Sequence, residues 1–392
     1  MLGHGLELDA DQLSACVSCG LCLPHCPTFR VTGEEAYSPR GRIDAMRGVQ
    51  SDGAPIDESF VEFMETCVQC RGCEPVCPSN VEFGALMEQT RTALATDGRI
   101  TPWWQRLGFK VLGHHRLLLA GSSLLAVAQR ARLVPSRLGL SRLPLRRPAP
   151  LTSTGDDVWL FTGCVMDAWQ RETHRSTAEL ITAVGAGYRI AGSRGACCGA
   201  LHVHAGLHED AVALADRVMA SMPGEAPVVV NSAGCGAVLK DYGNLVGTAA
   251  AARFAARVID VNEWLAERVD QLPAPTGERP SVIIQDPCHL RHVQRVDRPV
   301  RVLLGHVADV VELDDDGLCC GAGGAYSALQ PALANDIRQR KLDSIDRALA
   351  ARPAGVLASA NPGCSMHLAA ALGDRPIRVA HPVDIVAEAL RR

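Results

Sequence analysis

The chain has 392 residues, of which 47% are hydrophobic, 21% are charged and only 4% are aromatic. This composition is typical of a folded globular protein with two or three domains, and it excludes a largely disordered or collagen-like chain. The net charge of -4, from 39 basic and 43 acidic residues, excludes a chain-wide cationic surface for nucleic acid or membrane.

Sixteen cysteines are distributed along the chain. The N-terminal segment MLGHGLELDADQLSAC has neither a basic region nor an apolar stretch of useful length, so we expect a cytoplasmic protein. Thiols in a reducing compartment stay free and can ligate soft metals. The cysteines therefore predict metal or redox chemistry before disulfide bonds.

Two runs of cysteines in the first hundred residues share one pattern. Residues 16–27 and 67–78 both follow C-x2-C-x2-C-x3-C-P without deviation. In such runs the three close cysteines hold one [4Fe-4S] cluster, and the fourth, before a proline, ligates the other cluster. The pattern predicts two clusters, with these ligands: Cys16, Cys19, Cys22 and Cys77 for the first, and Cys67, Cys70, Cys73 and Cys26 for the second. Two zinc sites are the alternative, although zinc modules usually pair two C-x2-C knuckles at a longer separation.

The 40 residues between Cys26 and Cys67 form a longer interval than in a minimal bacterial ferredoxin. This interval predicts a helical insert. We therefore expect residues 1–98 to form an all-helical ferredoxin-like domain with both cluster motifs.

Residues 99–155 contain no Asp or Glu. The stretch carries ten positive charges: Arg99, Arg106, Lys110, Arg116, Arg130, Arg132, Arg137, Arg142, Arg146 and Arg147. Its apolar centre, residues 117–128, is shorter than the about 20 residues of a spanning helix. We expect a basic helical connector that docks on a partner flavoprotein or on an anionic membrane surface. A solvated linker packed on the neighbouring domains is the alternative.

Beyond residue 150, short apolar runs that read as buried strands are each followed by a helical segment. Four of these runs lead into a cysteine: DVWLFTGC, APVVVNSAGC, SVIIQDPCHL and GVLASANPGC. Strands alternating with helices favour an α/β architecture with mostly parallel sheets, which place their ligands at the carboxyl ends of the strands.

The cysteines of this part repeat at matching intervals. Cys164, Cys197, Cys198 and Cys235 in residues 156–275 are echoed by Cys288, Cys319, Cys320 and Cys364 in residues 276–392. A duplicated α/β unit of roughly 125 residues accounts for the repeat. Adjacent cysteines point to opposite sides of an extended backbone, which would suit a bridge or a cluster of unusual geometry. Small buried thiols that merely fill the sheet ends are the alternative.

Together these motifs resemble the iron-sulfur subunit of glycolate oxidase, within the wider group of cysteine-rich CCG domains related to heterodisulfide reductase. Almost the whole chain carries the resemblance. Besides the paired ferredoxin motifs it rests on these segments: SPRGRI (38–43), NSAGCGAVLKDYG (231–243), DPCHLRHVQ (286–294), CCGAGGAYS (319–327) and ANPGC (360–364).

The resemblance implies an electron conduit in a complex whose FAD-bearing subunits oxidise glycolate to glyoxylate and deliver electrons to a respiratory acceptor such as a quinone. It also implies a location in the cytoplasm or at the cytoplasmic face of the inner membrane. In the heterodisulfide reductase relatives each CCG motif ends in C-x2-C and holds a noncubane cluster. This chain has Ser232 and Asn361 at the first cysteine positions of those pairs. One ligand per motif is therefore missing, and an additional cluster and a purely structural role both stay open.

The chain contains no recognisable P-loop, and its Gly321-Ala-Gly323-Gly324-Ala-Tyr326 segment falls short of G-x-G-x-x-G. Without a hydride acceptor of its own, the chain must relay single electrons for a flavin-bearing partner. We assign no catalytic residue and expect the isolated chain to be inactive. The alternatives are the equivalent subunit of a D-lactate or anaerobic glycerol-3-phosphate dehydrogenase, and a cluster-dependent binding or scaffold protein. No nucleic-acid motif is recognised, so nucleic acid is not expected as a partner.

Overall fold

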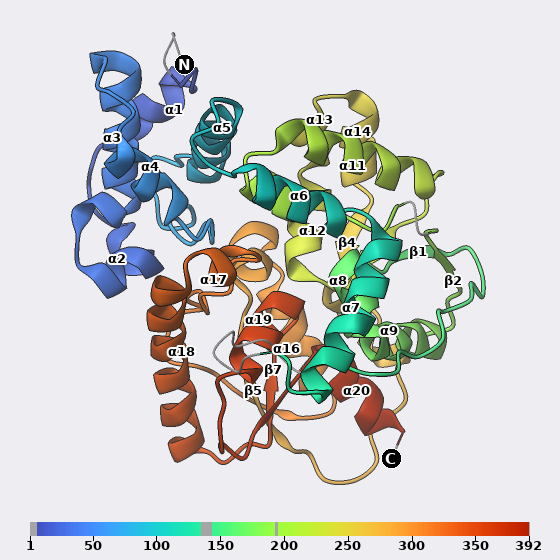
Figure 1. Ribbon diagram of the computed structural model, residues 1–392. Coiled ribbons are helices and arrows are strands. Elements are labelled where there is room, and N and C mark those ends of the chain that lie inside the picture. The colour runs from blue at the N-terminus through green and yellow to red at the C-terminus, as the bar shows by residue number, and fades with distance from the viewer. Residues whose placement is uncertain (1–5, 135–142, 193–194, 392) are drawn as a thin grey trace. The chain divides into compact units, whose positions relative to one another are not determined.

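The computed structural model describes residues 6–134, 143–192 and 195–391 (Figure 1). Arg137 and Arg142 of the basic stretch lie outside the described residues. The chain forms two compact units, each built from separate segments. The first comprises the chain up to Phe109 with Ala200–Ala211 and Leu318–Lys341, and the second comprises the remaining segments. The four-part division at residues 98, 155 and 275 stays a prediction.

The first unit is helical, which confirms the fold class expected for its N-terminal part. Its elements are α1 (Ala10–Ala15), η1 (Leu23–His25), α2 (Pro27–Thr32), η2 (Glu35–Tyr37), α3 (Pro39–Asp52), α4 (Glu58–Glu65), α5 (Phe83–Thr96), α10 (Ala200–His204) and α17 (Tyr326–Leu329). Three further helices begin in this unit and end in the second: α6 (Trp103–Leu112), α11 (His208–Ser221) and α18 (Pro331–Ala351).

Local sequence explains where the first helices begin and end. Helix α3 is capped by Ser38, whose hydroxyl accepts a hydrogen bond from the amide of Gly41 at 3.0 Å, and Pro39 occupies its first turn. It ends at Gly53, which has a φ of 69° that few other residues tolerate. The apolar faces of α3, α4 and α5 then form one core in which Met46, Met64 and Leu94 are fully buried.

Hydrogen bonds between residues far apart in sequence attach the two later segments to the first unit. The side-chain amide of Gln69 donates to the carbonyl of His204 at 3.0 Å. The hydroxyl of Tyr326 donates to the carbonyl of Thr66 at 3.1 Å. The segment beginning with α10 and the segment containing α17 are therefore integral parts of this unit.

The second unit contains two parallel four-stranded sheets of the same strand order, which confirms the duplicated α/β architecture. The first sheet has the order β2-β1-β3-β4, with β1 (Val158–Phe161), β2 (Tyr188–Ile190), β3 (Val228–Val230) and β4 (Val258–Asp260). The second has the order β6-β5-β7-β8, with β5 (Ser281–Ile284), β6 (Asp309–Val311), β7 (Val356–Ala358) and β8 (Arg378–Ala380). Register matches as well, because Leu160 pairs with Val229 in the first sheet as Ile283 pairs with Leu357 in the second.

One hydrophobic core joins the two repeats. It contains Leu160 of β1 and Ile284 of β5, together with apolar side chains from the helices packed between and beside the sheets. The helices of this unit are α7 (His115–Arg130), α8 (Cys164–Trp169), α9 (Arg171–Ala183), α12 (Ala233–Lys240), α13 (Tyr242–Val246), α14 (Ala249–Ala255), α15 (Val261–Ala266), η5 (Val269–Gln271), η6 (His289–Gln294), α16 (Asp297–Gly305), α19 (Pro362–Ala369) and α20 (Pro382–Leu390). Helix α9 of the first repeat packs on α20 of the second, and α15 of the first packs on α16 of the second. The helices of the two repeats therefore pack against each other.

Among the described helices, none alone is long and apolar enough to cross a membrane. The pair α6 and α7, bent by 99°, reaches the required length and composition only when both are taken together.

Candidate iron-sulfur sites

The two ferredoxin motifs have the same backbone conformation. In the first, Ser18 and Gly20 have φ values of 54° and 81°. In the second, Gln69 and Arg71 at the matching positions both have φ values of 56°. Left-handed residues in such loops turn backbone amides inward and form anion-binding concavities. The amide of Gln69 accordingly donates to the Sγ atom of Cys67 at 3.4 Å.

Arg71 is held in this strained conformation by its neighbours. Its guanidinium Nε pairs with the Glu74 carboxylate at 2.9 Å, and the same carboxylate accepts the amide of Gly84 at 2.7 Å. A Cβ added to Gly84 would lie 2.6 Å from the Arg71 Nε atom, so a larger residue there would displace the Arg71 side chain. The start of α5 is thereby fixed against the second cysteine loop.

The cysteines assigned to the second cluster are more buried than those assigned to the first. Cys26, Cys67 and Cys73 are buried, whereas Cys19 is exposed. Burial and the neighbouring thiols, Cys70 and Cys26 among them, raise the pKa of the Cys73 thiol. Cys26 therefore lies beside the thiols of the other motif. The remaining predicted ligands of the first cluster, Cys16, Cys22 and Cys77, are half-buried, and burial raises the pKa of Cys22 to about 11. The division of the eight cysteines between two clusters stays a prediction.

Two buried arginines lie next to the second set of cysteines. Arg42 is completely buried, and one of its guanidinium nitrogens lies 4.0 Å from the Sγ atom of Cys26. Arg91 donates to the backbone carbonyls of Met64, Glu65, Cys67 and His204, and burial lowers its pKa. Buried cations need a compensating negative charge. A cluster held by four thiolates is anionic, so the residues present fit a [4Fe-4S] group.

The first CCG quartet, defined as Cys164, Cys197, Cys198 and Cys235, comes together after the carboxyl ends of β1, β2 and β3. The thiol of Cys164 hydrogen-bonds to Cys197, and that of Cys198 to Cys235. These hydrogen bonds, followed by burial, raise the pKa of Cys164 and Cys198. A Cβ added to Gly163 would lie 3.7 Å from the Sγ atom of Cys235, so the two ends of the quartet approach closely.

The surroundings of this quartet are largely apolar. Leu118 of α7 and Leu214 of α11 pack with Cys164 and Cys197 in a separate hydrophobic cluster. The hydroxyl of Tyr242 donates to the carbonyl of Cys198 at 2.9 Å and fixes the double-cysteine turn. Adjacent cysteines thus have different partners, and all four thiols lie in one protected site.

The second CCG quartet is arranged differently. Cys288, at the start of η6, and Cys364, in α19, belong to the second unit, whereas Cys319 and Cys320 belong to the first. The Sγ atom of Cys319 accepts the amide of Gly321 at 3.4 Å. The Cys70 thiol hydrogen-bonds to Cys319, and this bond, together with burial, raises the pKa of Cys70. Identical spacing in sequence therefore does not give identical surroundings.

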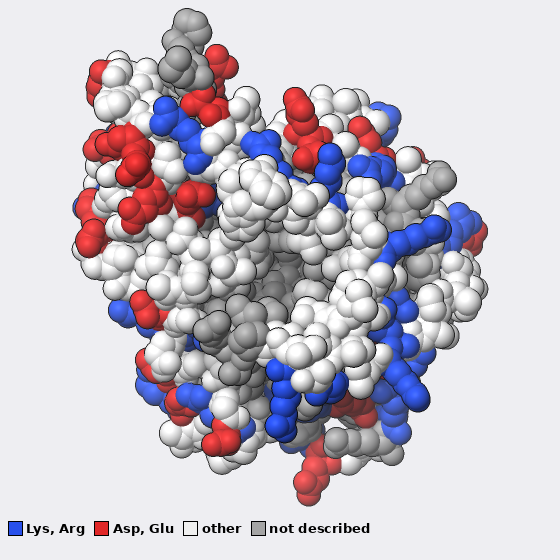
Figure 2. Space-filling model, in the orientation of Figure 1, with Lys and Arg blue, Asp and Glu red and all other residues white. Residues whose placement is uncertain are grey.

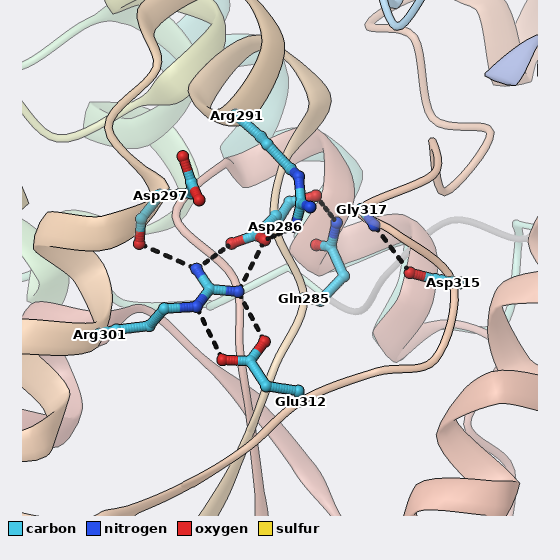
Figure 3. Close-up of polar contacts among 8 residues, drawn as sticks. All are labelled: Gln285, Asp286, Arg291, Asp297, Arg301, Glu312, Asp315 and Gly317. Atoms are coloured by element: carbon cyan, nitrogen blue, oxygen red, sulfur yellow. Dashed lines mark hydrogen bonds and ion pairs between the residues drawn. The ribbon is translucent and has the colours of Figure 1, made fainter. Parts of the chain in front are cut away.

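An ion-pair network fixes the segment that leads to Cys288 (Figure 3). Asp286 is almost completely buried and pairs with both Arg291 and Arg301 at 2.9 Å. Arg301 also pairs with Glu312 at 2.6 Å. The sequence alone gave no role to the Asp and Arg of the DPCHLRHVQ segment. An Asp between an apolar run and a cysteine was the available signal.

Within the described residues, no three His, Cys, Asp or Glu side chains are gathered closely enough to hold a single metal ion. The cluster ligands are therefore assigned from the motifs and the surroundings given above.

Comparisons with known proteins agree with this architecture. Residues 12–81 match the 4Fe-4S dicluster domain family, and residues 158–240 and 282–369 each match the cysteine-rich domain family. The fold and its cysteines define an iron-sulfur protein in which a dicluster domain precedes a repeated cysteine-rich domain.

Relatives along the full length give the family. The chain is 30% identical to the probable glycolate oxidase iron-sulfur subunit of Bacillus subtilis, over 98% of this chain and 95% of the relative. It is 29% identical to the glycolate oxidase iron-sulfur subunit of Escherichia coli, over 100% and 98%. It is 28% identical to one component of the dihydromethanophenazine:CoB–CoM heterodisulfide reductase of Methanosarcina mazei, over 97% and 94%. The chain belongs to the family of glycolate oxidase iron-sulfur subunits, as the resemblance of its motifs predicted.

Proposed function

We propose that this chain relays electrons from FAD-bearing dehydrogenase subunits, which oxidise glycolate to glyoxylate, to a respiratory quinone. The observation that carries the proposal is the pair of matching cysteine loops, the second of which has Arg42 and Arg91 buried beside it. When bound, [4Fe-4S] clusters supply one-electron transfer. The chain's own residues hold the sulfur ligands and supply positive charge around an anionic group.

The first experiment measures metal and activity separately. Anaerobically purified chain is expected to hold roughly eight or more iron atoms, as two four-iron clusters require. Alone it should not reduce an artificial dye with glycolate, and it should support dye reduction once combined with its FAD-binding partner subunits. Stoichiometric zinc without a brown chromophore, or glycolate oxidation by flavin-free chain, would overturn the proposal.

Substrate choice is tested on the same assembled complex. We propose glycolate because the two glycolate oxidase relatives cover nearly the whole chain. D-lactate and glycerol-3-phosphate are the competing substrates. A higher kcat/KM for either of them than for glycolate would identify the chain as a subunit of the corresponding dehydrogenase.

We propose that the first CCG quartet holds a further iron-sulfur cluster. Three of the four thiols are buried, and Cys164 and Cys197 pack in one hydrophobic cluster, which supports this proposal over scattered structural cysteines. Cys198→Ser should remove about four iron atoms, the content of one further [4Fe-4S] cluster, and leave the ferredoxin signals in electron paramagnetic resonance intact. Unchanged iron content and unchanged turnover would favour a structural role.

Helix α7 supports a peripheral contact with the cytoplasmic face of the inner membrane. Its outward side exposes Leu117, Leu124 and Val127, with exposed fractions of 55%, 73% and 58%. Figure 2 shows the uncharged surface over α7 bordered by Lys and Arg side chains. An apolar stripe with basic margins is the pattern of a helix that lies in the interface of an anionic bilayer.

The membrane proposal is tested with vesicles. Each Lys or Arg near an anionic surface contributes about 1 kcal/mol, and this attraction decays within a Debye length of roughly 8 Å. Wild type should co-sediment with anionic vesicles at low salt, less at high salt, and weakly with neutral vesicles. Leu124→Glu should reduce this binding more than Ala168→Ser, a change at a buried site. Equal sedimentation of both variants would leave α7 as a connector.

A further inference from the structure

Two polar residues stand at the start of the helices that carry the fourth cysteine of each repeat. Ser232 precedes α12, which contains Cys235, and Asn361 precedes α19, which contains Cys364. Ser and Asn at such positions usually accept an amide hydrogen bond from their own helix. Neither side chain does so here.

Asn361 instead caps the helix of the other repeat. Its Oδ1 atom accepts the amide of Gly234, in the first turn of α12, at 3.1 Å. The hydroxyl of Ser232 donates to the same oxygen at 3.4 Å. Because the amide of Gly234 can only donate, it identifies this atom of Asn361 as oxygen and leaves the Asn361 nitrogen as a donor.

Both residues also lie beside a cysteine sulfur. The Nδ2 atom of Asn361 donates to the Sγ atom of Cys364 at 3.4 Å. The hydroxyl of Ser232 is also within hydrogen-bonding reach of the Sγ atom of Cys235, so its one proton can turn from the Asn361 oxygen to this sulfur. Each polar residue thus lies within hydrogen-bonding reach of the cysteine three positions later in its own repeat. The two polar residues also hydrogen-bond to each other between the repeats.

Other contacts hold the two helix starts together. The amide of Ala233 donates to the carbonyl of Ala360 at 3.0 Å. Gln294 donates from the second repeat to Ala233 at 3.0 Å, and Gln170 donates from the first repeat to Ser365 at 2.9 Å. Each of these glutamines lies six residues after the first cysteine of its own repeat, so the exchange is reciprocal.

We infer that Ser232 and Asn361 are positioning residues that join the two cysteine-rich sites and set the reduction potential of the groups bound through Cys235 and Cys364. The inference rests on the proposed cluster at the first quartet and extends it to a group on Cys364. Hydrogen bonds to the sulfur atoms of a cluster are among the factors that set its reduction potential. A donor stabilises the reduced, more negative form, so loss of the donor lowers the potential.

Two variants separate the contact between the repeats from the hydrogen bonds donated to cysteine sulfur. Asn361→Asp keeps an oxygen that accepts the Gly234 amide but removes the nitrogen donor. Ser232→Ala removes one hydroxyl and leaves Gly234 capped by Asn361. The matched control is Gln170→Ala, which removes a hydrogen bond between the repeats without touching a cysteine.

The measurement is a redox titration of the complex followed by electron paramagnetic resonance, with iron counted in each sample. Both variants should keep wild-type iron. At a fixed potential, the reduced-to-oxidised ratio of the cysteine-rich signal should fall about tenfold, or about 59 mV for one electron. The ferredoxin signals and the control variant should not change.

The outcomes distinguish this inference from the proposed function. Full iron with unchanged potentials in both variants would overturn the inference and leave the cluster proposal intact. Loss of iron from both would also overturn it, because the residues would then serve assembly and not potential. A wild-type chain with only eight iron atoms and no further signal would remove the cysteine-rich clusters and this inference together, but not the ferredoxin relay.

Discussion

His174 and His381 are buried in the second unit and make its stability depend on pH. Burial lowers the pKa of His174 to about 4 and that of His381 to about 3, from an ordinary value of 6.5. Asp167, Arg171 and His381 are the charged or titratable groups that face His174. Both imidazoles are therefore neutral in the folded protein throughout the mildly acidic range.

The direction in which the free energy of unfolding changes with pH follows from proton binding. Between pH 6.5 and the folded values, the unfolded chain binds protons on these histidines and the folded chain does not, so stability falls as pH falls. At 1.36 kcal/mol per pKa unit, each histidine costs about 2 kcal/mol at pH 5. Asp260 opposes this, because burial raises its pKa to about 6 and the folded form gains its proton first. That gain is about 1.4 kcal/mol at pH 5, which leaves a net loss of about 3 kcal/mol.

The assay compares wild type with His381→Asn in anaerobic thermal unfolding at pH 7, 6 and 5. Asparagine preserves the helix cap, which in wild type accepts the amide of Val383 at 3.2 Å. Between pH 7 and pH 5 the variant should be destabilised by about 2 kcal/mol less than wild type. Its Tm should therefore fall by roughly 4–8 °C less than that of wild type, for a unit of this size. Parallel pH profiles for the two proteins would refute the reasoning.

Four further substitutions test other parts of the molecule. Cys26→Ser should abolish the cluster assigned to the second motif and Cys77→Ser that of the first, with electron paramagnetic resonance to identify the lost signal; loss of the neighbouring cluster in sequence would contradict the crossed assignment. Gly206→Ala should destabilise the first unit by about 1–3 kcal/mol, because its Cβ would lie 2.3 Å from the Arg91 carbonyl; this is checked by denaturant unfolding, and wild-type stability would be the contrary result. Leu160→Ala, in the shared core, should cost about 2–5 kcal/mol, and a loss below 1 kcal/mol would show that the core relaxes around the cavity.

Sequence predicted what depends on local spacing. The paired C-x2-C-x2-C-x3-C-P runs predicted two like motifs, and their loops have left-handed residues at matching positions. The repeated cysteines predicted a duplicated α/β unit, and the two sheets have the same strand order. Sequence did not predict that α10 and α17 join the ferredoxin unit, because contacts such as Gln69 to His204 link residues more than a hundred positions apart. It also missed the role of Asn361, because the ordinary capping rule pairs such a residue with its own helix.

The composition of the first unit constrains the order in which the protein is made. Its segments include Leu318–Lys341, so the unit cannot be completed until Lys341 has left the ribosome. Domains usually fold from the N-terminus during synthesis. Here the cysteine loops are synthesised early, but their contacts with later residues form only after those residues are made. One such contact is the hydrogen bond from the Tyr326 hydroxyl to the Thr66 carbonyl. The two cysteine loops are therefore complete in the nascent chain well before α17 and the start of α18, which are the last parts of this unit to be synthesised.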